Sequence, residues 1–157
     1  TSLNMKGIKF VFCLIFLVEI STGISMFDQK WKQTTQVLLG DCRTKTGATK
    51  EDFETLRLRK IPTTKTGLCL MECLFEGAGI MDNGTFDKEG TIVALTPSVN
   101  GDLSKIRKFR ELATACESEL GHKRLQNCQT GKKILQCLAT NGSKYGVQFI
   151  NTKKMNV

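Results

Sequence analysis

Seven cysteines and a single histidine are the side chains of this 157-residue sequence best suited to chemistry. Such cysteines bind metal or act as nucleophiles in a reducing compartment, and form disulfides in an oxidising one. A zinc site would need more than Cys69, Cys73 and the lone His122, and a thiol nucleophile would need a free cysteine with a histidine and a carboxylate beside it. We therefore expect no enzyme activity, no catalytic residue, no cofactor and no metal site.

The N-terminal residues indicate secretion, and with it an oxidising compartment. A short basic start that contains Met5, the better initiator, is followed by an apolar run, Phe10–Val18, and then by small or polar residues. This order is typical of a secretory signal peptide. The apolar run is too short for a bilayer, which needs about 20 residues. We predict a signal peptide over residues 1–25 and a secreted, extracellular product.

Cleavage of this signal changes the cysteine count. Cleavage after Gly23 and cleavage after Ser25 fit the small-residue rule about equally well. Either one removes Cys13 and leaves six cysteines, an even number that can pair completely. No second apolar run of membrane length follows, so we expect no stable membrane insertion.

The formal charge of +8 raises the question of a nucleic-acid partner. The densest basic cluster lies within Lys105–Arg110. Nucleic-acid binding favours basic residues on one face with aromatic residues between them. Here Asp102 and Glu111 interrupt the positive charge, so we interpret the cluster as a solvated helix surface and expect no nucleic-acid partner.

Apolar residues recur at helical spacing in six segments, which predicts an all-α domain. The first segment is Phe27–Leu39. Thr49–Asp52 is interpreted as a variant capping box at the start of the second, and Thr85 as the N-cap of the fourth. The third, Leu68–Phe75, is apolar almost all round, as is typical of a central buried helix.

The last two helices are predicted around Ile106–Cys116 and Ile134–Leu138, each with one apolar face. Asn141 and Gly142 are expected to cap the final helix. In the remaining residues Tyr145, Val147 and Phe149 alternate with polar neighbours, a pattern that suits a strand or an extended flap.

The six remaining cysteines follow the spacing C-x26-C-x3-C-x42-C-x11-C-x8-C, at Cys42, Cys69, Cys73, Cys116, Cys128 and Cys137. Cys69 and Cys73 lie four residues apart on the predicted buried helix and share one face, so they would bond to each other only by distorting it. Six cysteines allow fifteen pairings, and excluding this pair leaves twelve open.

The spacing resembles that of insect odorant-binding proteins of the pheromone- and general-odorant-binding (PBP/GOBP) family. The flanking residues agree: Gly47–Asp52 is similar to the family's Gly-x-Thr-x-Glu-Asp helix start, Ile61–Thr63 to its link before the second cysteine, and Gly79–Gly84 to its Gly-x-Met-x-x-Gly turn after the third. The resemblance covers about Phe27–Leu138. The chain departs from the family at Cys128–Gly131, where many members have Cys-Glu-x-Ala, and in its basic charge.

The resemblance implies a structure as well as a family. The implied disulfides are Cys42–Cys73, Cys69–Cys128 and Cys116–Cys137, and each would stabilise the fold by roughly 2–4 kcal/mol. The implied fold is a compact bundle of about six helices around an apolar cavity. We expect this domain over residues 26–142, followed by a C-terminal tail over residues 143–157 that can close as a lid.

The function that the resemblance implies is that of a secreted carrier. It would bind a small hydrophobic ligand (an odorant, a pheromone or a lipid-like molecule) in an internal cavity and transport it through aqueous lymph to an olfactory receptor. The hydroxyl of Ser143 or Tyr145 would supply a polar contact. The expected ligand-binding residues are Met71, Leu74, Met81, Ile92, Val93, Ile106, Phe109, Leu112, Ile134, Leu135, Tyr145 and Phe149.

A second hypothesis stays open. The chain would then be a non-olfactory secreted effector or scavenger of saliva, venom, haemolymph or reproductive fluid, binding lipids, amines or a macromolecular partner. Trp31 and the helix around Arg107–Arg110 would be its exposed contacts. Asn83 and Asn141 also begin glycosylation sequons.

Overall fold

The computed structural model describes residues 33–147. The chain divides into two compact units, Thr1–Leu39 and Gly40–Val157. A helix covers residues 33–46, and all further elements belong to the second unit. The predicted signal peptide, Trp31 and Phe149 lie outside the described residues.

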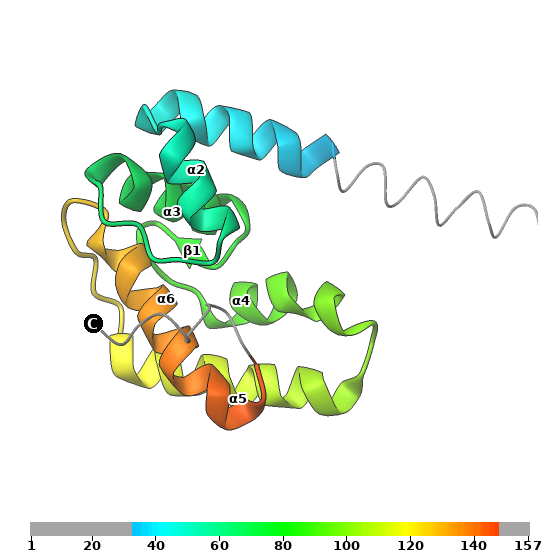
Figure 1. Ribbon diagram of the computed structural model, residues 1–157. Helices are drawn as coiled ribbons and strands as arrows, with labels where there is room; N and C mark the ends of the chain where they lie inside the picture. Colours follow the sequence, from blue (N-terminus) through cyan, green and yellow to red (C-terminus); the bar gives the residue numbers. More distant parts are fainter. Residues whose placement is uncertain (1–32, 148–157) are drawn as a thin grey trace, which may run out of the picture. The chain divides into compact units, whose positions relative to one another are not determined.

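Five more α-helices, one short antiparallel hairpin and two 3-10 helices follow in the second unit (Figure 1). In chain order they are α2 (Lys50–Arg57), α3 (Lys65–Gly77), β1 (Met81–Asp82), β2 (Thr85–Phe86), α4 (Lys88–Leu95), η1 (Thr96–Val99), α5 (Leu103–Leu120), α6 (Gln129–Gly142) and η2 (Ser143–Tyr145). With the helix over 33–46, the described residues contain six α-helices, so the predicted all-α bundle is confirmed.

The start of α2 is held by a buried carboxylate. The Thr49 hydroxyl accepts from the Asp52 backbone N–H, and Asp52 Oδ2 accepts from the Thr49 backbone N–H at 2.9 Å, which confirms the predicted capping box. Asp52 also accepts from the hydroxyls of Thr64, the N-cap of α3, and Thr66. Burial raises the pKa of Asp52, but these hydrogen bonds outweigh burial and hold the pKa below its usual range.

The start of α4 differs from the prediction. Thr85 lies in β2, where it pairs with Asp82, and Asp87 is the N-cap, with Oδ1 accepting from the Gly90 N–H at 2.6 Å. Asn83 and Gly84 both have positive φ and form the two-residue turn of the hairpin. Asn-Gly is a strong signal for such a turn, and the hairpin takes Thr85 out of the helix.

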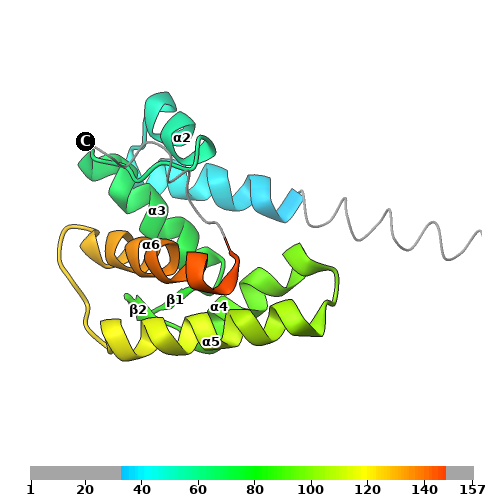
Figure 2. The same ribbon diagram turned by 60° about the horizontal axis from the view of Figure 1, so that its bottom comes forward.

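The main hydrophobic core lies where the hairpin, α4, α5 and α6 meet. Its buried residues are Met81, Phe86, Ile92, Leu112, Ala113, Cys116, Ile134, Cys137 and Leu138. α6 packs against both α5 and α3, and α4 packs against α5 (Figure 2). The apolar helix predicted around Leu68–Phe75 is α3, which buries Leu68, Leu70 and Met71.

Three disulfides connect the helices. Cys42–Cys73 joins the helix over 33–46 to α3, Cys69–Cys128 joins α3 to the start of α6, and Cys116–Cys137 joins α5 to α6. These are the pairs that the resemblance implied. Cys69 and Cys73 share one helix, and each bonds to a different neighbour.

The C-terminal end of the described residues differs from the prediction. α6 includes Asn141 and Gly142, and its C-cap is Ser143. Ser143–Tyr145 forms a 3-10 helix in place of the expected strand or flap, and Gly146 follows in the left-handed region. The helical turn ends there, since the Val147 N–H donates to the Gly142 carbonyl and the Gly146 N–H to the Ser143 carbonyl, the two hydrogen bonds of a Schellman motif.

Candidate binding pocket

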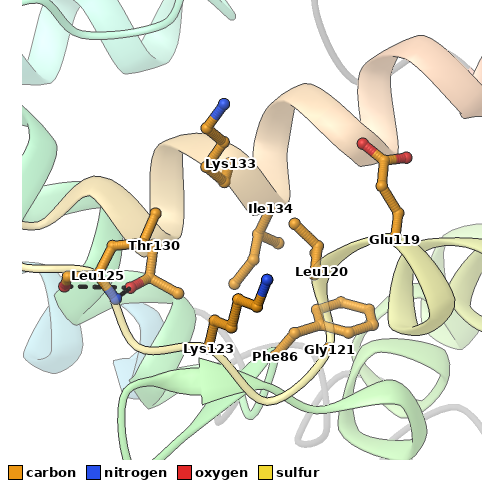
Figure 3. A pocket seen from close by; sticks show the side chains of 9 residues that line it. All are labelled: Phe86, Glu119, Leu120, Gly121, Lys123, Leu125, Thr130, Lys133 and Ile134. Carbon is orange, nitrogen blue, oxygen red and sulfur yellow. Dashed lines mark hydrogen bonds between the residues drawn. The ribbon is translucent and has the colours of Figure 1, made fainter.

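A pocket of about 270 Å³ lies between the end of α5, the start of α6 and β2 (Figure 3). Its volume is close to the lower end of the range for small-molecule sites, so it suits a small ligand. The lining residues are Phe86, Glu119, Leu120, Gly121, Lys123, Leu125, Thr130, Lys133 and Ile134.

The floor of this pocket is the outer surface of the hydrophobic core. Phe86 is 6% exposed and Ile134 is fully buried. Leu120 is half-buried and packs against the same core cluster. The three side chains lie together in the centre of Figure 3. Because Phe86 and Ile134 are already shielded from water, a ligand on this floor would mainly remove its own apolar surface and that of Leu120 from water.

One wall is the loop between α5 and α6. Gly121 ends α5 with a φ of 60°, in the left-handed region that favours glycine. The loop then reaches α6 at Leu125, whose backbone N–H donates to Thr130 Oγ1 at 2.8 Å. The Thr130 hydroxyl donates back to the Leu125 carbonyl, so both partners are satisfied within the wall.

The opposite wall is the first half of α6, and two links to α3 hold its start. The Cys69–Cys128 disulfide ends at the N-cap of α6. Three residues later, the Gly131 N–H donates to Glu72 Oε1 at 2.9 Å. Since α6 has no side-chain cap of its own, Glu72 from α3 satisfies an N–H of its first turn.

The rim of the pocket carries charge. Lys123 and Lys133 stand on the loop and on α6, and Glu119 stands on α5. In Figure 3 Lys123 reaches toward Leu120 and Ile134, whereas Lys133 points away from them. An apolar floor beneath a charged rim suits an amphipathic ligand better than a purely apolar one.

Two further pockets lie elsewhere in the second unit. One, of about 280 Å³, is lined by Ser98, Val99, Lys105, Lys108, Phe109, Tyr145, Gly146 and Val147. The other, of about 300 Å³, is mostly polar and is lined by Asp82, Thr85, Phe86, Asp87, Lys88, Glu89, Glu117 and His122. In it Glu117 accepts a hydrogen bond from Lys88 and raises the pKa of that ammonium group.

The structure does not gather the predicted ligand-binding residues in one pocket. Ile134 lines the first pocket, and Phe109 and Tyr145 line the second. Four others are buried in the core: Met71, Met81, Ile92 and Leu112. Three are half-buried outside these pockets: Leu74, Ile106 and Leu135. Val93 is 72% exposed on α4, and the exposed Ser143 donates its hydroxyl to the Thr140 carbonyl.

Sequence reasoning missed most of the first pocket. Leu120 lies four residues after Cys116, on the same face of α5. Extending the predicted helix by one turn would therefore have included Leu120 among the apolar residues of that face. Phe86 follows the Asn-Gly turn at the place where a hairpin strand would bury it. Lys123 and Leu125 stand in a loop, where hydrophobic periodicity gives no signal.

Within residues 33–147, no three side chains of His, Cys, Asp or Glu come together as a metal site. None of the helices in the described part of the chain is long and apolar enough to cross a bilayer.

Comparison with known proteins identifies the family. A sequence model of the PBP/GOBP family matches residues 24–141. The chain belongs to this family. Among curated relatives, general odorant-binding protein 19d of Drosophila melanogaster is 32% identical over 82 residues. This match covers 52% of the chain and 55% of that protein, so the chain spans about half the length of this curated relative.

Solved structures share the fold. Odorant-binding protein dmelOBP28a from Drosophila melanogaster matches 75% of this chain and 97% of its own, with a TM-score of 0.62 and 21% identity. Fatty acid binding protein OBP56a from the oral disk of the blowfly Phormia regina matches 73% of this chain and 94% of its own, with a TM-score of 0.55 and 21% identity. The predicted helical odorant-binding-protein fold is thereby confirmed.

Proposed function

We propose that this PBP/GOBP family protein is a carrier that binds a small hydrophobic ligand in the pocket between α5 and α6. The observation that supports this most directly is the apolar lining of this pocket, in which the half-buried Leu120 and the partly exposed Leu125 join the buried Phe86 and Ile134. Binding would proceed by burial, at roughly 25 cal/mol per Å² of apolar surface removed from water. No covalent step is needed, in keeping with a carrier rather than an enzyme.

The proposed role is carriage of odorants, pheromones or lipid-like molecules through an extracellular fluid. The family match and the names of the two Drosophila relatives support an odorant ligand. The name of the blowfly protein supports a fatty acid. The proposal includes secretion after removal of residues 1–25, delivery to an olfactory receptor, and a tail over residues 143–157 that closes over bound ligand.

The direct test is displacement of a fluorescent hydrophobic probe from the oxidised, signal-free protein by volatiles, fatty acids and amines. Micromolar displacement by volatiles supports odorant carriage. Absence of probe binding while all three disulfides are intact contradicts the proposal. The effector hypothesis would then be tested by a pull-down with the whole protein as bait, compared with a variant in which basic residues of α5 are replaced.

A matched pair of variants assigns the probe to this pocket. Leu125 is 38% exposed on the pocket wall, and Leu58, at the C-cap of α2, is 48% exposed and lines none of the three pockets. Leu125→Gln should weaken probe binding about fivefold, because part of a leucine's burial energy of about 1.5–3 kcal/mol is lost. Leu58→Gln should leave binding unchanged. Equal affinities for the two variants would place the probe elsewhere.

A further inference from the structure

The charged groups on the pocket rim differ in how well they are satisfied. The Glu119 carboxylate accepts a hydrogen bond from Asn141 Nδ2 at 3.3 Å. The Thr130 hydroxyl is bonded on both sides to Leu125. Among the described residues, the ammonium groups of Lys123 and Lys133 have neither a hydrogen-bond nor an ion-pair partner. The charged side chains of this pocket that have no protein partner in the described part of the chain are therefore both cationic, and both are exposed to solvent.

The two lysines are not equivalent. The loop that begins at Gly121 places Lys123 across the pocket from α6, and its side chain extends toward Leu120 and Ile134 (Figure 3). Lys123 therefore lines the same pocket as the apolar floor and points toward it. Lys133 points from α6 away from that floor, and the Glu119 carboxylate points toward α6 rather than toward Lys123. Lys123 is the cation best placed to meet a group on a bound ligand.

We infer that this pocket selects an anionic amphiphile, whose charged head group contacts Lys123 while its apolar part lies on Phe86, Leu120 and Ile134. The inference rests on the proposed function and narrows its ligand class. A carboxylate or a phosphate monoester would supply the head group, since each accepts charge-assisted hydrogen bonds from an ammonium group. An alcohol or an aldehyde of the same length would fill the floor but leave Lys123 without its charged partner.

The net charge of the rim agrees with this selection. Two unpartnered cations and one hydrogen-bonded carboxylate leave an excess of positive charge at the mouth of an apolar pocket. The whole chain has a formal charge of +8, which adds a long-range attraction for anions. Because the rim is open to solvent, added salt should screen the attraction and weaken binding of a charged ligand selectively.

The test compares three ligands that share one chain: decanoate, decyl phosphate and 1-decanol. Each displaces a neutral fluorescent probe from the full, oxidised, signal-free protein at neutral pH. We expect the two anions to bind about five- to tenfold more tightly than decanol, in the range of a partly exposed charge-assisted contact. The anion with the larger advantage identifies the head group.

Three Lys→Met variants test which ammonium group causes the preference for anions. Lys123→Met keeps the length of the side chain, and should abolish the preference for the anions, measured as the ratio of the decanol and decanoate dissociation constants within the same variant. Lys133→Met should reduce the preference by about twofold at most, because its ammonium group points away from the floor. Lys65→Met makes the same change in net charge at the start of α3, outside this pocket, and should change nothing.

The outcomes separate this inference from the proposed function. If decanol binds as tightly as decanoate, or if Lys123→Met and Lys65→Met behave alike, the anionic selection is wrong and the hydrophobic carrier still stands. If none of the three ligands and no probe binds, the carrier proposal itself fails. A preference that vanishes in Lys123→Met alone supports the inference.

Discussion

Removal of the Cys69–Cys128 disulfide should lower probe affinity more than removal of a disulfide of similar stabilising effect that lies away from the pocket. The bond closes a loop with a sequence separation of 59 residues and ends at the N-cap of α6. The loop-entropy relation gives a loss of about 4.3 kcal/mol for the Cys69→Ala/Cys128→Ala pair. The start of α6 would then be held to α3 by the Glu72–Gly131 hydrogen bond and by the packing of the two helices, without the covalent link.

The matched control is the Cys42→Ala/Cys73→Ala pair. This bond has a sequence separation of 31 residues, for which the same relation gives a loss of about 3.7 kcal/mol. It joins the helix over 33–46 to α3 and touches neither wall of the pocket between α5 and α6. The two variants therefore lose nearly the same stability, and they differ in whether the start of α6 remains attached.

The measurements are urea unfolding and probe titration at low temperature, with far-UV circular dichroism to verify that each variant is folded. Both variants should lose about 4 kcal/mol of unfolding free energy. Probe affinity should fall about threefold to tenfold in Cys69→Ala/Cys128→Ala, because fewer molecules hold the binding-competent wall. It should stay within about twofold of the parent in the control. An equal loss of affinity in both variants would refute the assignment of the pocket to the start of α6.

Two further predictions concern the fold. Asp52→Asn should cost about 1–3 kcal/mol at pH 7, since the buried carboxylate accepts from Thr49, Thr64 and Thr66. Because the folded-state pKa of Asp52 is lowered, its contribution is complete above the unfolded pKa of about 3.9 and is lost as the pH falls through the folded value. The stability gap between parent and variant should therefore close in urea unfolding below about pH 4, and a gap independent of pH would contradict this. Gly90→Ala should destabilise by about 1–3 kcal/mol despite better helix propensity, because its Cβ would lie 1.8 Å from the backbone carbonyl oxygen of Gly79. Gly40→Ala, with open space around its Cβ, is the control and should be neutral or stabilising in thermal melts.

The sequence predicts this fold best where spacing alone determines it. The four-residue separation of Cys69 and Cys73 requires two different disulfide partners for α3, and the structure has Cys42 and Cys128 in those roles. The capping box at Thr49 is equally local, since both partners lie within one helical turn. The failure at Thr85 is instructive because its hydroxyl suits an N-cap, yet the adjacent Asn-Gly turn places it in β2.

The pocket could not be predicted from periodicity. Hydrophobic periodicity indicates which residues face the interior, but not whether other side chains or a pocket lie against them. Met81 and Leu112 show the burial expected of cavity residues, but they are covered by other side chains of the core. Ile134 has the same helical signal and lines the pocket from beneath. The difference between them is made by the loop from Gly121 to Leu125, whose path depends on tertiary contacts with α6.

The two sides of this pocket are held with very different strength, and that difference bears on ligand choice. The floor belongs to a core that the Cys116–Cys137 disulfide links across α5 and α6. The loop wall is tied to α6 at Leu125 by two hydrogen bonds to a single hydroxyl, that of Thr130. A weakly tied wall can shift to admit ligands of varied shape at small cost, while a fixed floor supplies the same apolar surface to each. Shape should then discriminate poorly between ligands, and under the inference above the contact with Lys123 would be what distinguishes an anionic ligand from a neutral one of the same length.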